Sequence, residues 1–131
     1  TTVDFNGLVS FLSVLRFYEV IDFCMENPII DTINWALLEW PTNLRVNNLP
    51  QKIKDDLIPK YERWPDIQAA LRLPEDKTNN LPGSNNEPLD IQKTFDYLLK
   101  QDEYYIGTKW EMHLFDVFPE LKEYYIKPED R

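Results

Sequence analysis

The side chains that most often carry chemistry are sparse in this sequence of 131 residues. It contains one histidine, His113, and one cysteine, Cys24. A structural zinc site takes four ligands, mainly cysteine and histidine, so this pair is too small a set. With three glycines there is no GxGxxG or Walker loop, and no GxSxG elbow is present. The sequence therefore predicts no catalytic residue and no metal ligand.

Each of the remaining reactive or aromatic side chains has a structural interpretation. Cys24 lies on the apolar face of a helical pattern and is interpreted as a small core residue rather than a reactive thiol. His113 is interpreted as a surface residue or one satisfied by hydrogen bonds. The carboxylates are too abundant for a catalytic pair to be identified by counting. The tryptophans are predicted to be core residues rather than ligand stackers: Trp35, Trp40, Trp64 and Trp110.

The formal net charge of −9 limits the classes of partner. General nucleic-acid binding needs a basic footprint, and anionic membrane surfaces attract basic segments, so we expect neither partner. We also expect no membrane span, because no run of about eighteen apolar residues occurs. The hydrophobic content of 43% is typical of a packed globule. We expect one domain over residues 1–131, in a reducing, cytoplasmic compartment.

The elements that position these residues centre on the densest apolar run, residues 33–40. It is bounded by Pro28 and Pro41 and predicts a buried strand. Because both faces carry apolar residues, we expect cover on both sides, as in a parallel α/β sheet. A buried helical turn is the alternative. One face carries Ile33, Trp35 and Leu37. The other face carries Asn34, Ala36 and Leu38.

Helical periodicity predicts several helices around this strand. A helix over residues 14–26 ends at Asn27-Pro28, and another begins at Pro50 and breaks at Pro59. A short helix over residues 66–73 follows, and the clearest pattern covers residues 89–102. A last helix is predicted to start at residues 118–120.

Other local signals predict turns, caps and loops. The first five residues are β-prone, and Asn6-Gly7 is a strong turn signal. Residues 44–46 are predicted to be extended. The residues Thr108 and Glu111 have capping-box spacing, which predicts a short helix to about residue 115. The segment 74–88 is rich in Pro and Asn and is predicted to be a mobile loop. The predicted fold is α/β, mainly helical, with two or three short strands.

Several of these stretches together resemble a known family. The β-prone TTV, the Asn-Gly loop, INWALLEWPTNLRVNNLPQKIK, FDYLLKQDEYYIGTKW and FPELKEYY are similar to the C-terminal part of radical SAM proteins of the twitch-domain type. These proteins are common in marine bacterial and phage sequence. The resemblance covers most of the chain through short motifs. It implies that the chain was part of a (β/α) barrel.

The resemblance also implies what the chain lacks. The family's CxxxCxxC motif, which holds the [4Fe–4S] cluster that binds S-adenosylmethionine, has no counterpart, because Cys24 stands alone. We therefore expect a non-catalytic fragment or remnant of such an enzyme. It would use these cofactors only if an upstream region exists. On fold position, Asn6 and Glu39 are candidates for the barrel mouth.

An acidic protein-interaction module is the alternative function. In either case, unpaired strand edges and an apolar strand favour self-association. The residues expected to supply the contact area are Trp35, Leu37 and Leu38, and the predicted assembly is a homodimer.

Overall fold

The computed structural model describes residues 2–131 of the protein. It is a mixed α/β structure, mainly helical, with one two-stranded parallel sheet. The chain divides into two compact units, of which the first ends at Asp76 and the second spans Lys77–Arg131. The boundary lies inside the segment 74–88, for which the sequence predicts a loop. No helix within the described residues is long and apolar enough to cross a membrane.

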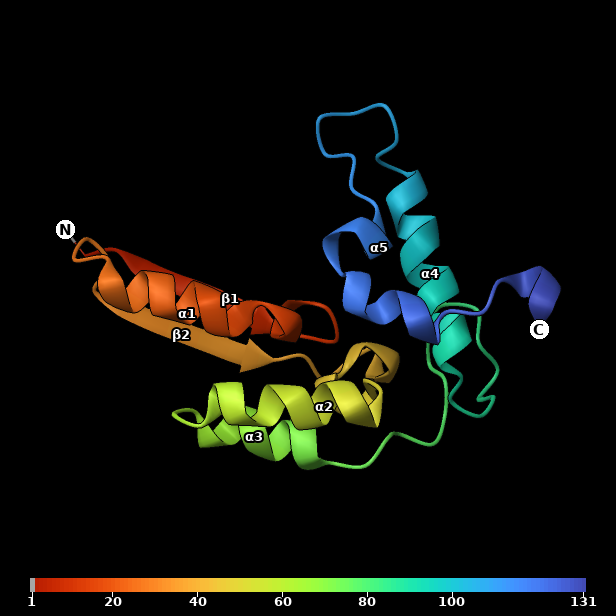
Figure 1. Ribbon diagram of the computed structural model, residues 1–131, viewed down its shortest axis with the longest axis horizontal. Coiled ribbons are helices and arrows are strands. Elements are labelled where there is room, and N and C mark those ends of the chain that lie inside the picture. Colours follow the sequence, from red (N-terminus) through yellow and green to blue (C-terminus); the bar gives the residue numbers. More distant parts are fainter. Residues whose placement is uncertain (1) are drawn as a thin grey trace. The chain divides into compact units, whose positions relative to one another are not determined.

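The first unit contains both strands and three of the α-helices (Figure 1). In chain order these are β1 (Asp4–Val9), α1 (Phe17–Glu26), β2 (Thr32–Leu37), α2 (Gln51–Leu57) and α3 (Pro65–Arg72). The second unit contains α4 (Ile91–Glu103) and α5 (Leu114–Val117). The 3-10 helices are Ser13–Leu15, Thr42–Leu44, Val46–Asn48, Ile58–Tyr61, Pro119–Tyr124 and Pro128–Asp130.

The sheet of the first unit is a β-α-β arrangement. The strands β1 and β2 run parallel, with Asp4 opposite Thr32 and Val9 opposite Leu37. The connection passes through α1, which lies over one face of the two strands (Figure 1). The strand predicted in the run of residues 33–40 is thus confirmed as β2, Thr32–Leu37, and the alternative of a helical turn is wrong.

The expectation that this sheet is covered on both faces is wrong. On β2, the side chains of Ile33, Trp35 and Leu37 are half-buried, whereas Asn34 and Ala36 are exposed. The exposed face carries polar or small residues there, and such side chains gain little from burial. The pattern is the alternation typical of a sheet with one solvated face.

The Asn6-Gly7 pair does not form the predicted turn. It lies inside β1, where Gly7 is opposite Trp35 on the neighbouring strand. A Cβ atom at Gly7 would lie only 2.6 Å from the Cε1 atom of Phe17 on α1. The glycine is therefore explained by the close approach of an aromatic ring and not by a turn.

The rest of the first unit follows most of the predicted breaks. The helix α1 ends before Asn27, and α2 gives way to the 3-10 helix Ile58–Tyr61 around Pro59, as predicted. Of residues 44–46, which are predicted to be extended, only Arg45 has an extended backbone, because Leu44 ends one 3-10 helix and Val46 begins the next. The largest fully buried side chains of this unit are Tyr61, Phe11, Ile21, Leu49, Ile67, Leu71, Val9 and Val14.

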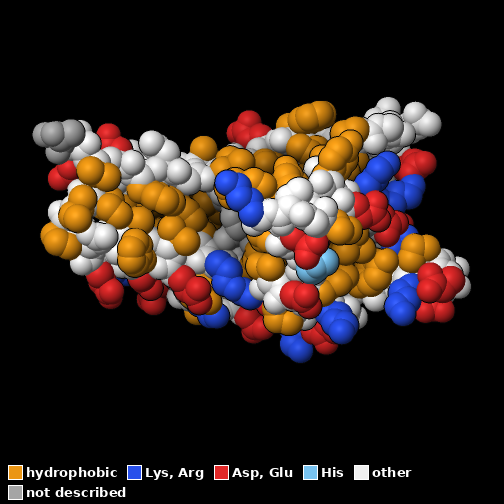
Figure 2. Space-filling view, turned by 90° about the horizontal axis from the view of Figure 1, so that it is seen from above, with side chains coloured by type: hydrophobic (Ala, Val, Ile, Leu, Met, Phe, Trp, Pro, Cys, Tyr) orange, Lys and Arg blue, Asp and Glu red, His pale blue; other side chains and the backbone are white. Residues whose placement is uncertain are grey.

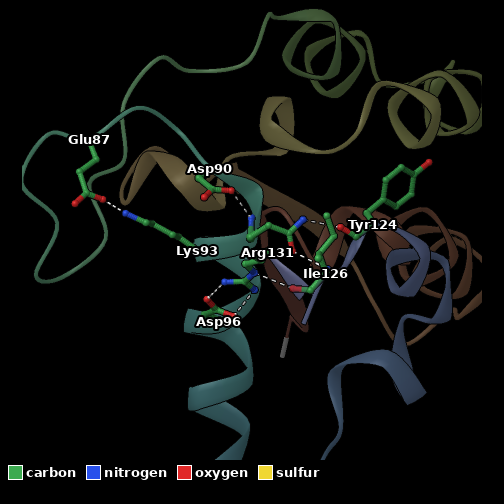
Figure 3. A network of polar contacts seen from close by, with 8 residues as sticks. Glu87, Asp90, Lys93, Asp96, Tyr124, Ile126 and Arg131 are labelled. Atoms are coloured by element: carbon green, nitrogen blue, oxygen red, sulfur yellow. Dashed lines mark hydrogen bonds and ion pairs between the residues drawn. The ribbon is translucent and has the colours of Figure 1, made fainter. Parts of the chain in front are cut away.

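In the second unit, α4 confirms the predicted helix over residues 89–102. Its N-cap is Asp90, whose side chain accepts a hydrogen bond from the Gln92 backbone N–H at 2.9 Å. On the opposite side of the same turn, the Gln92 side chain bonds the backbone of Tyr124 and Ile126. These contacts hold the C-terminal segment along α4 (Figure 3).

The C-terminal residue completes this attachment. The Arg131 guanidinium makes two hydrogen bonds to the Asp96 carboxylate, at 2.6 and 2.8 Å, and its Nε donates to the Ile126 carbonyl (Figure 3). Paired N–H···O bonds of this kind fix geometry as well as charge. Beneath them, the ring of Phe95 contacts those of Phe115 and Tyr125.

Candidate functional site

The two candidate barrel-mouth residues are not at equivalent positions. Asn6 lies in the middle of β1, on the exposed face of the sheet, because the strand continues to Val9. Glu39 follows the carboxyl end of β2, two residues beyond Leu37. Only Glu39 is therefore at the edge where open parallel sheets bind ligands.

A small pocket of about 130 Å³ lies at this carboxyl edge, with Glu39 in its wall. Leu37 and Leu38 also line it, together with Arg45. The Arg45 guanidinium already pairs with Asp76, at 3.3 Å between Nη1 and Oδ1. The pocket is too small for most cofactors. It has room only for a very small ligand or a few waters.

The remaining predicted contact residue, Trp35, is engaged within its own unit. Its indole N–H donates to the Asp66 carboxylate at 2.7 Å. Its ring centroid lies 6.0 Å from that of Phe17 and 6.4 Å from that of Trp64, both in edge-to-face geometry. Trp35 thus joins the sheet to α1 and to the start of α3.

The largest group of exposed apolar side chains in the second unit lies between α4 and α5. We call residues 104–112 the aromatic loop. Figure 2, which looks down on this loop, shows hydrophobic side chains at the surface around the chain's single histidine. The exposed members, with their exposed fractions, are Tyr104 (78%), Tyr105 (48%), Ile106 (59%), Trp110 (64%) and Met112 (54%).

Part of the aromatic loop lines a shallow, open pocket of about 470 Å³. Three of its walls are Tyr105, Trp110 and Met112, and the fourth is Asp102 near the end of α4. One oxygen of Asp102, Oδ2, accepts the Leu114 backbone N–H at 2.8 Å and so holds the start of α5. The volume is in the range of small-ligand sites.

Side-chain hydrogen bonds hold the aromatic loop in shape without forming the predicted helix. The Thr108 hydroxyl donates to the Tyr105 carbonyl at 2.7 Å and accepts the Trp110 N–H at 3.2 Å. The Glu111 carboxylate accepts the Gly107 N–H at 2.8 Å. These are bonds of the capping-box kind, but Gly107 has φ +81°, and the segment turns back instead of continuing as a helix.

The same bonds favour the ionised form of the Glu111 side chain. The Gly107 N–H, and after it the nearby His113, hold the pKa of the Glu111 carboxyl below its ordinary value. The His113 Nε2 atom lies 3.5 Å from Glu111 Oε2. His113 is exposed, as predicted, and lies at the base of the aromatic loop.

Sequence reasoning missed this site because its residues follow neither a helical nor a strand period. The interpretation of Trp110 as a core residue is wrong, and so is that of Trp40, which is 68% exposed. The available signal was the density of aromatic residues around Gly107, without a spacing that would bury them.

The residues that carry reactive groups are not gathered at either pocket. Cys24 is a buried free thiol in the first unit, as predicted, whereas His113 belongs to the second. Over residues 2–131, no three His, Cys, Asp or Glu side chains come together as a metal site.

Comparisons of the chain with protein-family models, with curated proteins and with solved structures gave no match. The resemblance to radical SAM proteins therefore depends on the short motifs quoted above.

Proposed function

We propose that the protein is a non-enzymatic interaction module that binds a partner protein through the aromatic loop. One observation carries this proposal: Trp110, Tyr105 and Met112 are about half exposed or more around one pocket. Trp, Tyr and Met are enriched in the cores of protein interfaces, and Trp and Tyr supply much of the binding energy there. A loop that presents them together has the composition of an interface centre.

The fixed geometry of the loop supports the same function. The bonds made by Thr108 and Glu111 fix the backbone that carries the aromatic side chains before any partner arrives. Binding then needs less ordering of the chain, and affinity rises for the same contacts.

The test is selection of ligands from a displayed random-peptide library on the full chain. We expect the enriched peptides to lose binding to Trp110→Ser, at least about tenfold, as is typical of an interface centre. The matched control is Trp40→Ser, which removes a tryptophan of similar exposure from the first unit and should leave binding unchanged. A set of peptides that ignores Trp110→Ser, or no enrichment, would rule out the aromatic loop.

A second candidate is the fragment or remnant of a radical SAM protein. The observation that favours it is the β-α-β unit: within residues 2–131, the outer edges of β1 and β2 carry no further strand. A (β/α) barrel repeats this unit with neighbours on both sides. The test is the coding sequence upstream of Thr1. An in-frame CxxxCxxC motif would support this candidate, and a start codon directly before Thr1 would remove the fragment form of it.

A further inference from the structure

We propose that the pocket of Asp102, Tyr105, Trp110 and Met112 binds a methylated ammonium group carried on a partner polypeptide, such as the side chain of trimethyllysine. This inference rests on the proposed function and names the chemistry that the aromatic loop recognises.

Charge complementarity is the first argument. The faces of Tyr and Trp rings are negative and attract cations, and the Asp102 carboxylate adds a full negative charge to the same pocket. The chain as a whole has a net charge of −9. The Lys109 ammonium is 4.9 Å from the Trp110 ring centroid, so this ring attracts a cation, and a ligand cation must use the rest of the ring surface or displace Lys109. Lys109 itself does not line the pocket.

The apolar walls select among cations. A bare lysine ammonium is strongly hydrated, and an arginine guanidinium carries five N–H donors, so both give up more hydration than a methylated ammonium when they contact apolar side chains. Here the lining side chains offer the Asp102 carboxylate and the Tyr105 hydroxyl. Oδ2 of Asp102 already accepts the Leu114 N–H. A methylated ammonium needs few or no hydrogen bonds and gains contact with the rings and with Met112.

The surroundings of the pocket favour a polypeptide as the carrier. Tyr104 and Ile106 are 78% and 59% exposed and belong to the same loop, but they do not line the pocket. A free small cation would leave them uncovered. A chain that inserts one side chain into the pocket has apolar surface to contact on either side.

The test uses the full chain and three peptides of one sequence, with trimethyllysine, lysine, or the neutral carbon isostere that has tert-butyl in place of trimethylammonium. Nuclear magnetic resonance follows the Trp110 indole N–H during titration. We expect the trimethyllysine peptide to bind about tenfold more tightly than the isostere, because only the charge differs. The lysine peptide should also bind more weakly. Free choline, which carries the same head group without a peptide, should bind more weakly than the trimethyllysine peptide.

Variants separate the contributions of ring and charge. Asp102→Asn keeps an oxygen acceptor for Leu114 and removes the charge, so we expect binding about threefold weaker. Trp110→Ala should abolish binding of the trimethyllysine peptide. Because this variant lacks the Trp110 indole, its titration is followed at the Tyr105 backbone N–H. Trp40→Ala is the matched control and should change nothing.

The outcomes distinguish this inference from the function beneath it. If the isostere peptide binds as tightly as the trimethyllysine peptide, the pocket does not recognise a cation. If choline binds as tightly as the trimethyllysine peptide, the ligand need not be carried on a polypeptide. If no peptide of the three binds, while displayed peptides still depend on Trp110, the ligand class is wrong and the interaction surface stands. If displayed peptides also ignore Trp110, both proposals fail.

Discussion

Tyr61 joins two segments of the first unit through one buried hydroxyl. The hydroxyl donates to the Val14 carbonyl and accepts the Tyr18 N–H at 3.0 Å, and the side chain is fully buried. Burial disfavours the phenolate and raises the pKa of Tyr61 well above its ordinary value. Its protonated form therefore stabilises the fold fully below the unfolded pKa of about 10, and this contribution is lost as the pH rises through the folded pKa.

We expect Tyr61→Phe to lower the free energy of unfolding by about 1–3 kcal/mol, because it keeps the ring and removes the hydroxyl from the buried Val14 carbonyl and the part-buried Tyr18 N–H. Urea denaturation measures the change. The matched control is Tyr18→Phe, whose half-buried hydroxyl bonds the Lys60 ammonium at 3.1 Å and should contribute much less. Equal losses in the two variants would contradict this role for Tyr61.

At the scale of elements, the aromatic loop is closed by one ionised side chain. Because the pKa of Glu111 is lowered in the folded chain, the closing bond to Gly107 is present above the ordinary carboxyl pKa. The charge that strengthens this bond is lost as the pH falls through the folded value. Acid therefore weakens the bond between Gly107 and Glu111, while the bonds of Thr108 remain.

We predict that the Gly107 amide resonance titrates with a midpoint below that of an ordinary glutamate, which is about 4.3. Glu111→Gln keeps an oxygen acceptor and cannot ionise, so its Gly107 resonance should stay constant over the same range. A titration that persists unchanged in Glu111→Gln would assign the effect to another group.

The elements that could be predicted are those whose signal is local. The helices α1 and α4 follow from an apolar stripe of helical period and a stop or cap signal, and β2 follows from a bounded apolar run. Asn6-Gly7 was misread because its local turn preference is overridden by pairing with β2 and by the packing of Phe17. A sequence does not reveal such a contact between distant residues.

The candidate site was harder to predict than the elements for a related reason. Its side chains are grouped by hydrogen bonds of Thr108 and Glu111, and the same two residues also fit a helix start. Gly107, with its left-handed backbone, belongs to the turn that follows α4, and the next helix begins only at Leu114. Glu39 follows the carboxyl end of β2, and its position could be predicted because the strand before it has a local signal.

At the scale of the whole molecule, the segment 74–88, most of which belongs to the second unit, combines anchored and exposed residues. Leu81 is buried, and the Asn79 N–H donates to the Glu87 carbonyl at 2.8 Å, so the base of the loop is closed. Its tip, residues 82–86, contains Gly83 with φ +86°, which has open space around its Cα. The mobility of this tip stays a prediction.

We expect subtilisin to make its first cut within residues 82–86, because this exposed tip has one backbone hydrogen bond, from Ser84 to Leu81. Mass spectrometry of the early fragments locates the cut. Leu81→Ser should accelerate it by removing the buried anchor. A first cut inside α4 would contradict the assignment.

The parallel pairing of β1 and β2 determines the order in which the first unit can fold. Asp4 and its partner Thr32 are 28 residues apart in the sequence. During synthesis β1 emerges first and has no strand to pair with until α1 and β2 have followed. Closing so long a segment is slow, whereas neighbouring helices such as α2 and α3 need only local contacts. The strand β1 therefore gains its strand neighbour only after this segment has closed, and its other edge carries no strand within residues 2–131.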